Sequence, residues 1–533
     1  MTEHAQRIEE QPRELAPQRI SHGVADLPEY VDVVVIGLGV TGAGVALDAV
    51  TRGLSVLAVD AHDLAFGTSR WSSKLVHGGL RYLAKGQVGV AHESAVERGV
   101  LMEITAPHLT KPMPMLVPLN SAVGGFQGAL TRAGFAAGDV LRRGAHTSAE
   151  TLPRPRRLSA AETKALAPCL RSAGLRGGLL SWDGQLEDDA RLVIALARTA
   201  AEHGALVRTY ARVVEATGTS VTLRDEHGVD GDADEHSTDD HQHTVRAGAV
   251  INATGVWAGE LVPEVRLRPS RGTHLVLRAE TLPGLNVAVT APVPGTINRF
   301  VMVLPQPDGT IYVGLTDEPV EGPVPDVPEA TESEIGFLLD VASAAFTRPL
   351  RRSDVVGAFA GLRPLLDTDD DEGTADISRK HAVLTSATGV VTVVGGKLTT
   401  YRQMAQDAVD AALVAGGLSA GQCRTHSLPL VGAAPRAELA ALEAPERLVR
   451  RFGTDADLVL RNAVEVTGLA ESELLAPASP QVPVTLAELV FGVTHEGAVD
   501  VDDLLDRRTR VGLVAADRAA VEPLARRALE LAE

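Results

Sequence analysis

The residues best suited to chemistry are three glycines in the run Gly37-Leu38-Gly39-Val40-Thr41-Gly42. Glycines at this spacing permit a tight turn, let the backbone approach a pyrophosphate, and let a helix pack closely on a strand. The free N–H groups at the start of such a helix attract phosphate oxygens. Asp60 follows 18 residues after Gly42, where a carboxylate can accept hydrogen bonds from a ribose. The pattern predicts dinucleotide binding at Gly37, Gly39, Gly42 and Asp60, without distinguishing NAD from FAD.

The segment from Thr68 to Tyr82 mixes hydroxyls, glycines and bases with large apolar side chains. A solvated loop has little use for Trp71, whereas a core element would not contain Lys74 or Arg81. The mixture is typical of a segment that lies along a large polar cofactor, and it favours FAD. The cofactor contacts predicted in this segment are Thr68, Ser69, Ser72, Ser73, Lys74, His77, Gly78 and Gly79.

Two later segments, 252–258 and 394–402, also lead from a strand into a helix through glycines. The N–H groups at the start of each helix are suited to the polar edge of an isoalloxazine ring. The predicted cofactor contacts here are Thr254, Gly255, Gly396, Lys397, Leu398 and Thr399.

A strand–helix–strand unit must position the first glycines. Residues 31–36 form a β-branched run typical of a strand buried on both faces, 45–52 are helical, and 54–59 form a second apolar run. Further strands are expected at 249–252, 273–277, 301–304, 310–315 and 390–394, and helices at 91–105, 188–203 and 401–415. From about residue 430 a helical periodicity dominates, as in 507–532, which indicates a separate helical domain.

Composition narrows the possible partners. The 533 residues suggest two to four domains, and 50 basic against 69 acidic residues give a formal net charge of −19. The excess acids lie in three stretches without Lys or Arg, at 225–240, 321–334 and 367–376, which are expected to be surface loops. The balance argues against nucleic acid as the main partner. The histidines of loop 225–243 have irregular spacing and no cysteine nearby, so a solvated hairpin tip is expected and no metal site.

No signal peptide and no apolar run long enough to span a membrane is evident, and two cysteines cannot form a disulfide framework. These features favour a reducing, cytoplasmic location.

The chain resembles the FAD-dependent glycerol-3-phosphate dehydrogenases of the respiratory, quinone-linked type. The resemblance rests on the segments 36–44, 72–83, 271–274, 361–365 and 395–402, and in the C-terminal part on His495-Glu496 and 506–509. It covers nearly the whole chain from residue 31, except the acidic loop 225–243. It implies an α/β protein: a Rossmann-like FAD-binding domain interleaved with a mixed-sheet α+β substrate domain, followed by an all-helical C-terminal cap.

The expected domain boundaries follow from this resemblance. Residues 1–29 are predicted to be a mobile arm, 30–430 the oxidoreductase region, and 431–533 the helical C-terminal domain. The cofactor-binding segments are expected at about 30–115, 170–270 and 355–415, and the substrate segments at about 116–169 and 271–354.

The resemblance also assigns a substrate site. It implies oxidation of sn-glycerol 3-phosphate to dihydroxyacetone phosphate by hydride transfer from carbon 2 to flavin N5. Arginine suits the phosphate, because its planar fork binds two oxygens. Arg363 and His274 are expected to be catalytic, with His274 as the base that takes the hydroxyl proton and His77 as its rival. The residues expected to line the substrate pocket are Arg81, Tyr82, His274, Arg363, Arg379 and Lys397.

The partners implied are a membrane quinone, a peripheral contact with the inner face of the cell membrane, and a homodimer. Residues 126–143 are the candidate membrane helix, with Phe126, Leu130 and Val140 on an apolar face and Arg132, Arg142 and Arg143 toward lipid headgroups. One alternative is an oxidase that reduces O2 to H2O2, although an expected extra insertion is not found. A non-catalytic flavin scaffold is a remote alternative.

Overall fold

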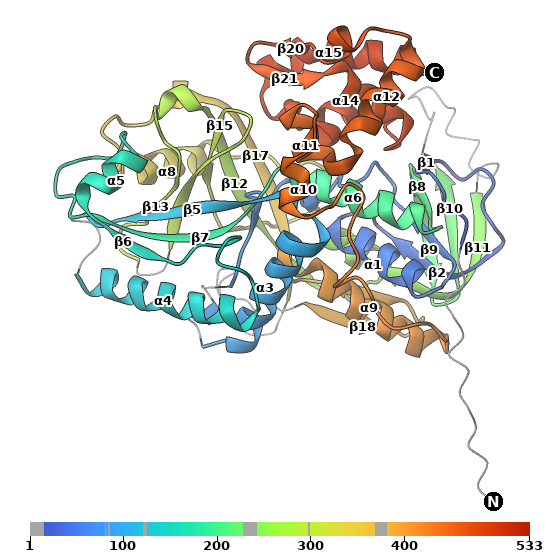
Figure 1. Cartoon of the computed structure of the whole chain (residues 1–533). Coiled ribbons are helices and arrows are strands. Elements are labelled where there is room, and N and C mark those ends of the chain that lie inside the picture. The colour runs from blue at the N-terminus through green and yellow to red at the C-terminus, as the bar shows by residue number, and fades with distance from the viewer. Residues whose placement is uncertain are drawn as a thin grey trace, which may run out of the picture.

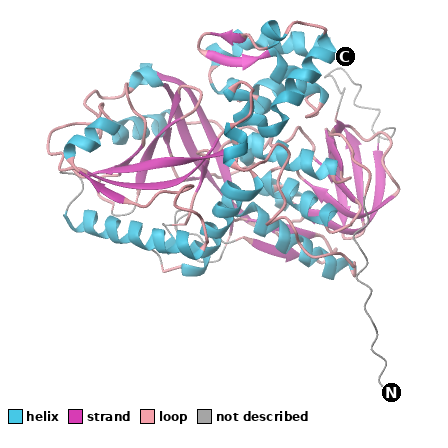
Figure 2. Ribbon diagram, in the orientation of Figure 1, coloured by secondary structure: helices cyan, strands magenta, loops and turns pink. Residues whose placement is uncertain are grey.

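The computed structural model describes residues 15–79, 82–83, 86–120, 125–226, 242–296, 299–367 and 381–532, without the side chains of 125–127. Two mixed β-sheets with their helices lie side by side, and the C-terminal domain sits above the junction between them (Figure 1). Figure 2 shows helices packed against both sheets, which is the predicted α/β class. That fold class is confirmed.

The first sheet runs in the order β1-β8-β3-β2-β11-β10-β9, with β19 beside β11 and β18 beside β19. Its inner strands pair in parallel, while β9, β10 and β11 form an antiparallel meander. Its strands are β1 (Ser21–His22), β2 (Tyr30–Ile36), β3 (Val56–Val59), β8 (Leu206–Thr209), β9 (Ala211–Thr217), β10 (Ser220–Asp225), β11 (Gln242–Asn252), β18 (Ala382–Thr385) and β19 (Val391–Val394).

Strand β2 forms the centre of this sheet because its valines are buried on both faces. Val33 and Val35 pack with α1 (Val40–Thr51), α6 (Asp189–Glu202) and α9 (Tyr401–Gly416). Val34 packs on the opposite face with side chains of β9, β10 and β11. Helix α1 begins directly after the glycine turn, as the sequence predicts, so the sheet and the helix together hold that turn.

The second sheet runs β16-β12-β15-β14-β13-β5-β7-β4, with β17 beside β12 and β6 beside β7. Helix α8 (Glu332–Ser343) packs on its core, and α4 (Gly125–Gly144) lies next to α3 (Val88–Val100). Another helix here is α5 (Ala160–Leu166), whereas α7 (Ala258–Leu261) packs on the first sheet beside β9. Its strands are β4 (Leu75–Val76), β5 (Thr110–Pro118), β6 (Arg156–Leu158), β7 (Gly178–Leu186), β12 (Leu267–Arg278), β13 (Ala288–Pro292), β14 (Phe300–Pro305), β15 (Thr310–Gly314), β16 (Glu318–Pro319) and β17 (Val355–Leu366).

The C-terminal domain is a helical cluster with its own apolar core. It also contains a short hairpin, β20 (Pro477–Ser479) with β21 (Val482–Thr485), that the sequence did not predict. Helix α15 (Ala515–Ala532) begins later than the periodicity of 507–532 suggested, because 503–508 forms a separate helical turn. Its other helices are α10 (Arg436–Ala440), α11 (Glu446–Phe452), α12 (Ala456–Thr467), α13 (Glu471–Leu474) and α14 (Leu486–Thr494).

Two expectations about the polar segments need correction. Residues 15–29 are not a mobile arm, because β1 pairs in parallel with β8, and both Ile20 and Leu27 are buried. Within the acidic stretch 321–334, Glu334 is only 5% exposed. It closes a capping box with Thr331 and pairs with Arg271, so it belongs to the core of α8 rather than to a surface loop.

The segment boundaries between the two sheets also differ from those expected. Strand β7, expected on the cofactor side, pairs with β5 and β4 in the second sheet. Strand β17, likewise expected on the cofactor side, pairs along its length with β12. Strand β17 also contacts β19 of the first sheet, and its residues Gly361 and Arg363 line the cavity described next.

Candidate active site

A cavity of about 730 Å³ is lined by residues of both sheets. Its lining includes Gly37, Gly39 and Asp60, at the ends of β2 and β3. It also includes His274 of β12, Arg363 of β17 and Lys397. Predicted residues far apart in the chain are thus brought to one continuous space, whose volume is in the range of cofactor and ligand pockets.

The glycine turn leaves no room for side chains. Gly37 has φ +96°, and a Cβ atom there would lie 2.8 Å from the Ala253 carbonyl oxygen. At Gly39 it would lie 2.9 Å from Ser69 Oγ, on the cavity wall. At Gly42 it would lie 1.7 Å from the Gly37 carbonyl oxygen, so Gly42 serves the packing of α1 and does not line the cavity. Gly37 thus serves the tight turn against the 253–254 backbone, and Gly39 is the position at which the backbone can approach a pyrophosphate.

Asp60 ties the end of β3 to this turn. Its Oδ2 accepts from the Leu38 N–H at 2.6 Å, and its Oδ1 accepts from the His62 N–H at 2.9 Å. Burial raises the pKa of Asp60 to about 6 even though these two hydrogen bonds lower it. The carboxylate faces the cavity at the position predicted for a ribose contact.

The side chains of the segment that begins at Thr68 lie partly on the cavity wall and partly in the protein interior. Thr68, Ser69, Ser72, Ser73 and His77 line the cavity. The other predicted contacts of this segment, Lys74, Gly78 and Gly79, do not line it, and neither does Thr399 of the later segment 394–402.

The departure is clearest at Lys74, where sequence reasoning predicted a cofactor contact. Lys74 is 1% exposed, and its amine donates to the Arg70 carbonyl oxygen at 2.6 Å and pairs with Asp189 at 2.9 Å. A buried lysine needs such a partner. The Lys74 amine therefore holds this segment in place from the protein interior.

His77 is held by an acid and a hydroxyl. Its ring atom Nδ1 lies 3.0 Å from Asp183 Oδ2, and its backbone N–H donates to Thr399 Oγ1 at 3.1 Å. Burial alone would raise the pKa of Asp183, but the Arg98 charge, 2.5 Å away, and the His77 contact lower it to about 2. The imidazole is therefore oriented by a permanent carboxylate, with 43% of its side chain exposed.

His274 lies deeper in the wall. It is 1% exposed, stacks on Phe359 at a centroid distance of 4.8 Å, and places Nε2 2.8 Å from Ser73 Oγ. Burial, together with the charges of Lys74 and Arg363, lowers its pKa to about 3. The ring is neutral at physiological pH, and its Nδ1 makes no hydrogen bond to any described residue.

Arg363 reaches the cavity over Gly272, where a Cβ atom would lie 2.3 Å from Nη2. Its guanidinium donates to Ser270 Oγ, to Asp317 Oδ1 and to the Thr316 carbonyl oxygen, each at 3.1 Å. These three oxygens fix the orientation of the fork while 18% of the side chain stays exposed.

Lys397 is a further cation in the lining of the cavity. Its amine donates to Ser94 Oγ and lies 4.2 Å from the centre of the Tyr82 ring, which itself is not in the lining. Gly396, Leu398, Thr254 and Gly255, which the sequence predicts as cofactor contacts, also line the cavity. The predicted substrate residues Arg81 and Arg379 lie outside the described residues.

Several lining residues were missed from the sequence. Arg212 and Val213 of β9 belong to no motif with a recognisable chemistry. Trp257 belongs to the predicted segment 252–258 but was not named as a contact; it lies against Gly67, where a Cβ would be 2.7 Å from its ring. Trp71 also lines the wall, and its buried Nε1 has no hydrogen-bond partner among the described residues. The close-approach glycines and the unpaired buried atoms of Trp71 and His274 are features that a bound FAD would fill and satisfy.

Comparisons with known proteins agree with this geometry. Residues 32–402 match the family described as FAD dependent oxidoreductase, and residues 423–531 match the C-terminal domain of alpha-glycerophosphate oxidase. The chain is 53% identical over 502 residues to glycerol-3-phosphate dehydrogenase 1 of Mycobacterium tuberculosis, covering 93% of this chain and 94% of that protein. It is 34% identical over 512 residues to the mitochondrial glycerol-3-phosphate dehydrogenase of Rattus norvegicus, covering 91% and 68%.

A solved structure is also similar over nearly the whole chain. The glycerol-3-phosphate dehydrogenase from Bacillus halodurans complexed with FAD gives a TM-score of 0.69 at 26% identity, covering 95% of this chain and 92% of that one.

Proposed function

The chain belongs to the family of FAD-dependent glycerol-3-phosphate dehydrogenases, and from this premise we propose that it oxidises sn-glycerol 3-phosphate at carbon 2 to dihydroxyacetone phosphate. The observation that carries the proposal is the single cavity that joins a dinucleotide-binding turn to a buried neutral histidine and two cations. Oxidation of a phosphorylated alcohol needs a cation to bind the phosphate and a base to take the hydroxyl proton. The lining of the cavity contains both kinds of residue.

Arg363 and Lys397 are proposed to bind the phosphate. The guanidinium fork suits two phosphate oxygens, and its three present oxygen partners hold it in place before substrate arrives. Asp317 partly balances the charge of the Arg363 guanidinium. Tyr82, beside Lys397, is proposed to orient that amine.

His274 is proposed to take the proton of the carbon 2 hydroxyl. Its neutral ring has a lone pair that can accept a proton, but a pKa of about 3 makes it a weak base in the protein alone, and the negative charge of the bound phosphate would raise that pKa. Ser73 fixes the ring through Nε2. Loss of that proton and of the hydrogen on carbon 2 with its electron pair leaves the C=O double bond of the product. FAD, when bound, supplies at N5 the acceptor for that hydride.

The residues proposed to hold FAD are those that line the rest of the cavity. The glycine turn and the start of α1 would bind the pyrophosphate, and Asp60 the ribose. The loops at 254–255 and 396–398 would lie against the ring system.

The decisive experiment is anaerobic mixing of the purified, FAD-loaded protein with sn-glycerol 3-phosphate. Rapid loss of the oxidised flavin absorbance is expected, together with one equivalent of dihydroxyacetone phosphate. Glycerol, which lacks the phosphate, is the matched control and is expected to react far more slowly. Equal rates with both compounds, or no bleaching by either, would contradict the proposed substrate.

A membrane quinone is the proposed electron acceptor, on the basis of the resemblance to the respiratory dehydrogenases. The oxidase alternative has one observation in its favour, the match of residues 423–531 to a domain named for alpha-glycerophosphate oxidase. Turnover in air with and without a soluble quinone analogue separates the two. Hydrogen peroxide formed in proportion to product, and unaffected by the quinone, would favour the oxidase.

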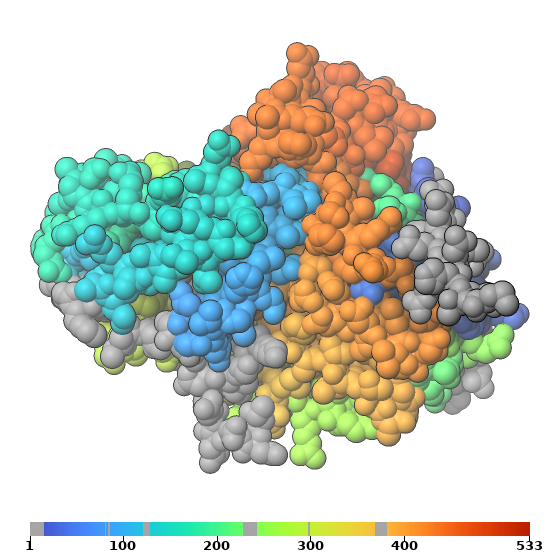
Figure 3. Space-filling view, turned by 60° about the horizontal axis from the view of Figure 1, so that its bottom comes forward, coloured from blue at the N-terminus to red at the C-terminus, as the bar shows by residue number. Residues whose placement is uncertain are grey.

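Helix α4 is the proposed contact with a membrane surface; Figure 3 shows it on the face turned toward the viewer, in turquoise. Leu130 and Val140 are 54% and 65% exposed, and Arg143 is exposed as well. Arg142 is not available to headgroups, because it is buried and donates to Asp139 and to the Thr147 carbonyl oxygen. Phe126 lies in the part of the helix whose side chains are not described.

Among the described residues, no helix combines the length and apolarity required to cross a bilayer. The expected homodimer and the location on the inner face of the membrane remain predictions.

A further inference from the structure

The loop that follows β3, residues 60–70, connects the cavity with the C-terminal domain. On one side Asp60, His62, Phe66 and Ser69 line the cavity. In the middle, Asp63 is fully buried and does not line it. The loop thus has one surface toward the cofactor cavity and another toward the domain above.

Both ends of this loop hold the glycine turn. Asp60 accepts from the Leu38 N–H at 2.6 Å, and Ser69 Oγ accepts from the Val40 N–H at 2.9 Å. These two amides flank Gly39, where the backbone must approach the cofactor. A shift of the loop would therefore shift the turn itself.

The C-terminal domain holds the same loop through Asp63. Arg507 Nε donates to Asp63 Oδ2 at 2.6 Å, and Arg508 donates to both carboxylate oxygens at 2.6 and 2.8 Å. Both arginines are buried, at 4% and 2% exposed. Although burial opposes ionisation, the two guanidinium groups keep the pKa of Asp63 below its ordinary value, so the carboxylate stays charged.

Further contacts reinforce the same link. Arg70, at the other end of the loop, pairs with Asp506 at 3.3 Å and lies 4.2 Å from the Trp71 ring on the cavity wall. The Tyr210 hydroxyl donates to Asp503 Oδ1 at 2.7 Å, while the Tyr210 N–H donates to the His62 carbonyl oxygen at 3.2 Å.

We propose that Asp63, Arg507 and Arg508 form a positioning cluster through which the docked C-terminal domain holds the 60–70 loop in its FAD-binding conformation. Retention of the cofactor then depends on this domain, although the domain contributes no residue to the cavity lining among the described residues. The proposal requires FAD binding, which family membership gives, and not the proposed substrate.

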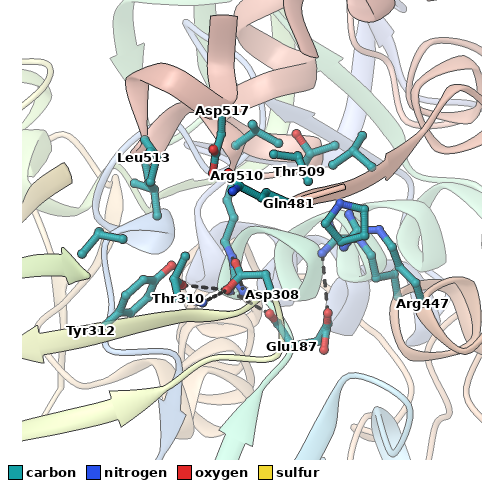
Figure 4. Close-up of a pocket in the computed structure, with 17 residues that line it drawn as sticks. Glu187, Asp308, Thr310, Tyr312, Arg447, Gln481, Thr509, Arg510, Leu513 and Asp517 are labelled. Carbon is teal, nitrogen blue, oxygen red and sulfur yellow. Dashed lines mark hydrogen bonds and ion pairs between the residues drawn. The ribbon is translucent and has the colours of Figure 1, made fainter. Parts of the chain in front are cut away.

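A second aspartate–arginine contact with the same domain supplies a matched control. Figure 4 shows the Arg510 side chain directed at Asp308 of the second sheet, with donor distances of 2.9 and 3.2 Å. It lies beside a cavity of only about 40 Å³. Asp308 thus anchors the C-terminal domain as Asp63 does, but it has no contact with the 60–70 loop.

The test compares Asp63→Asn with Asp308→Asn in the full-length holoenzyme. Breaking a buried ion pair is costly, so we expect Asp63→Asn to release FAD at least about tenfold faster, followed as the rise in flavin fluorescence on dilution. Asp308→Asn should change the release rate less than about twofold, even where both variants lower the unfolding temperature. Equal release rates in the two variants, or an unchanged rate in Asp63→Asn, would overturn the proposal.

A milder variant covers the case in which Asp63→Asn fails to fold. Arg508→Lys keeps the charge but loses the fork that binds both carboxylate oxygens. We expect FAD release to be about threefold faster, a change of well under one hydrogen bond in free energy. An unchanged release rate in this variant would contradict the positioning role.

Discussion

Two arginine-bearing motifs of this protein, around Arg363 and around Arg507 and Arg508, have different surroundings in the structure. Among the described residues Arg363 pairs with Asp317, lies over a glycine, and lines a large cavity. Arg508 is 2% exposed and is enclosed by Asp63 and the Glu496 carbonyl oxygen. An arginine that must bind an incoming anion keeps part of its fork accessible, whereas one that fastens two domains is saturated by buried oxygens.

The first prediction tests whether His274, which lines the same cavity as Arg363, takes part in the reaction. His274→Asn removes the proposed base and should slow anaerobic flavin reduction by glycerol 3-phosphate about 10²–10⁴-fold, the usual contribution of a positioned base. Stopped-flow absorbance measures the rate. His108→Asn is the control, because His108 is equally buried but borders the C-terminal domain at Gly453. Similar rates for wild type and His274→Asn would exclude His274 as the base.

The second prediction tests the anion-binding arginine itself. Arg363→Lys keeps the charge and loses the fork, so kcat/KM should fall about 100-fold, equivalent to one or two charge-assisted hydrogen bonds. Arg271→Lys is the control in the same sheet, since Arg271 pairs with Glu334 and does not line the cavity. If both variants lose activity equally, Arg363 does not bind the phosphate and the contrast with Arg508 is wrong.

The sequence predicts best where backbone geometry alone decides the outcome. The β-branched run and the glycine spacing place β2, the turn and α1 within a few residues of their observed bounds. Gly39 and Asp60 line the cavity because they follow β2 and β3, two neighbouring parallel strands whose carboxyl ends lie at the same edge of the sheet.

Side chains whose partners are distant in the chain were predicted less well. Lys74 was expected at the cofactor, but its partner Asp189 lies on α6, 115 residues away. Arg212 lines the cavity through tertiary packing, with no local pattern to indicate it. The C-terminal motif around Arg507 carried the family resemblance, yet its role as a docking site depends on Asp63, 444 residues away.

The third prediction concerns the pH dependence of stability, and it rests on His108, the buried histidine beside the C-terminal domain. Burial, followed by the charges of Arg191 and Arg198, lowers the pKa of His108 to about 3. In the unfolded chain the pKa returns to about 6.5, so protonation favours unfolding as the pH falls below that value. Between pH 7.5 and 5 this linkage should cost about 2 kcal/mol of stability.

Urea unfolding of wild type and His108→Asn at the two pH values measures this cost. The free-energy difference between the two proteins should shift by about 2 kcal/mol in favour of the variant at pH 5. Groups common to both proteins, such as Asp60 with its opposite sign, cancel in the comparison. A constant difference across the range would mean that the pKa of His108 is the same in the folded and the unfolded chain.

The last and smallest effect extends the comparison to α4, where neighbouring arginines again divide between inside and outside. Arg142 is buried against Asp139, while Arg143 is 57% exposed beside Leu130 and Val140 on the same helix. Leu130→Asp should weaken binding to anionic liposomes about fivefold, or roughly 1 kcal/mol for partial burial of one leucine, measured by flotation. Val414→Asp on α9, at 84% exposed, is the matched control and should bind like wild type. Because neither side chain packs in a core, stability should stay unchanged, and equal flotation of the two variants would mean that α4 is an ordinary surface helix.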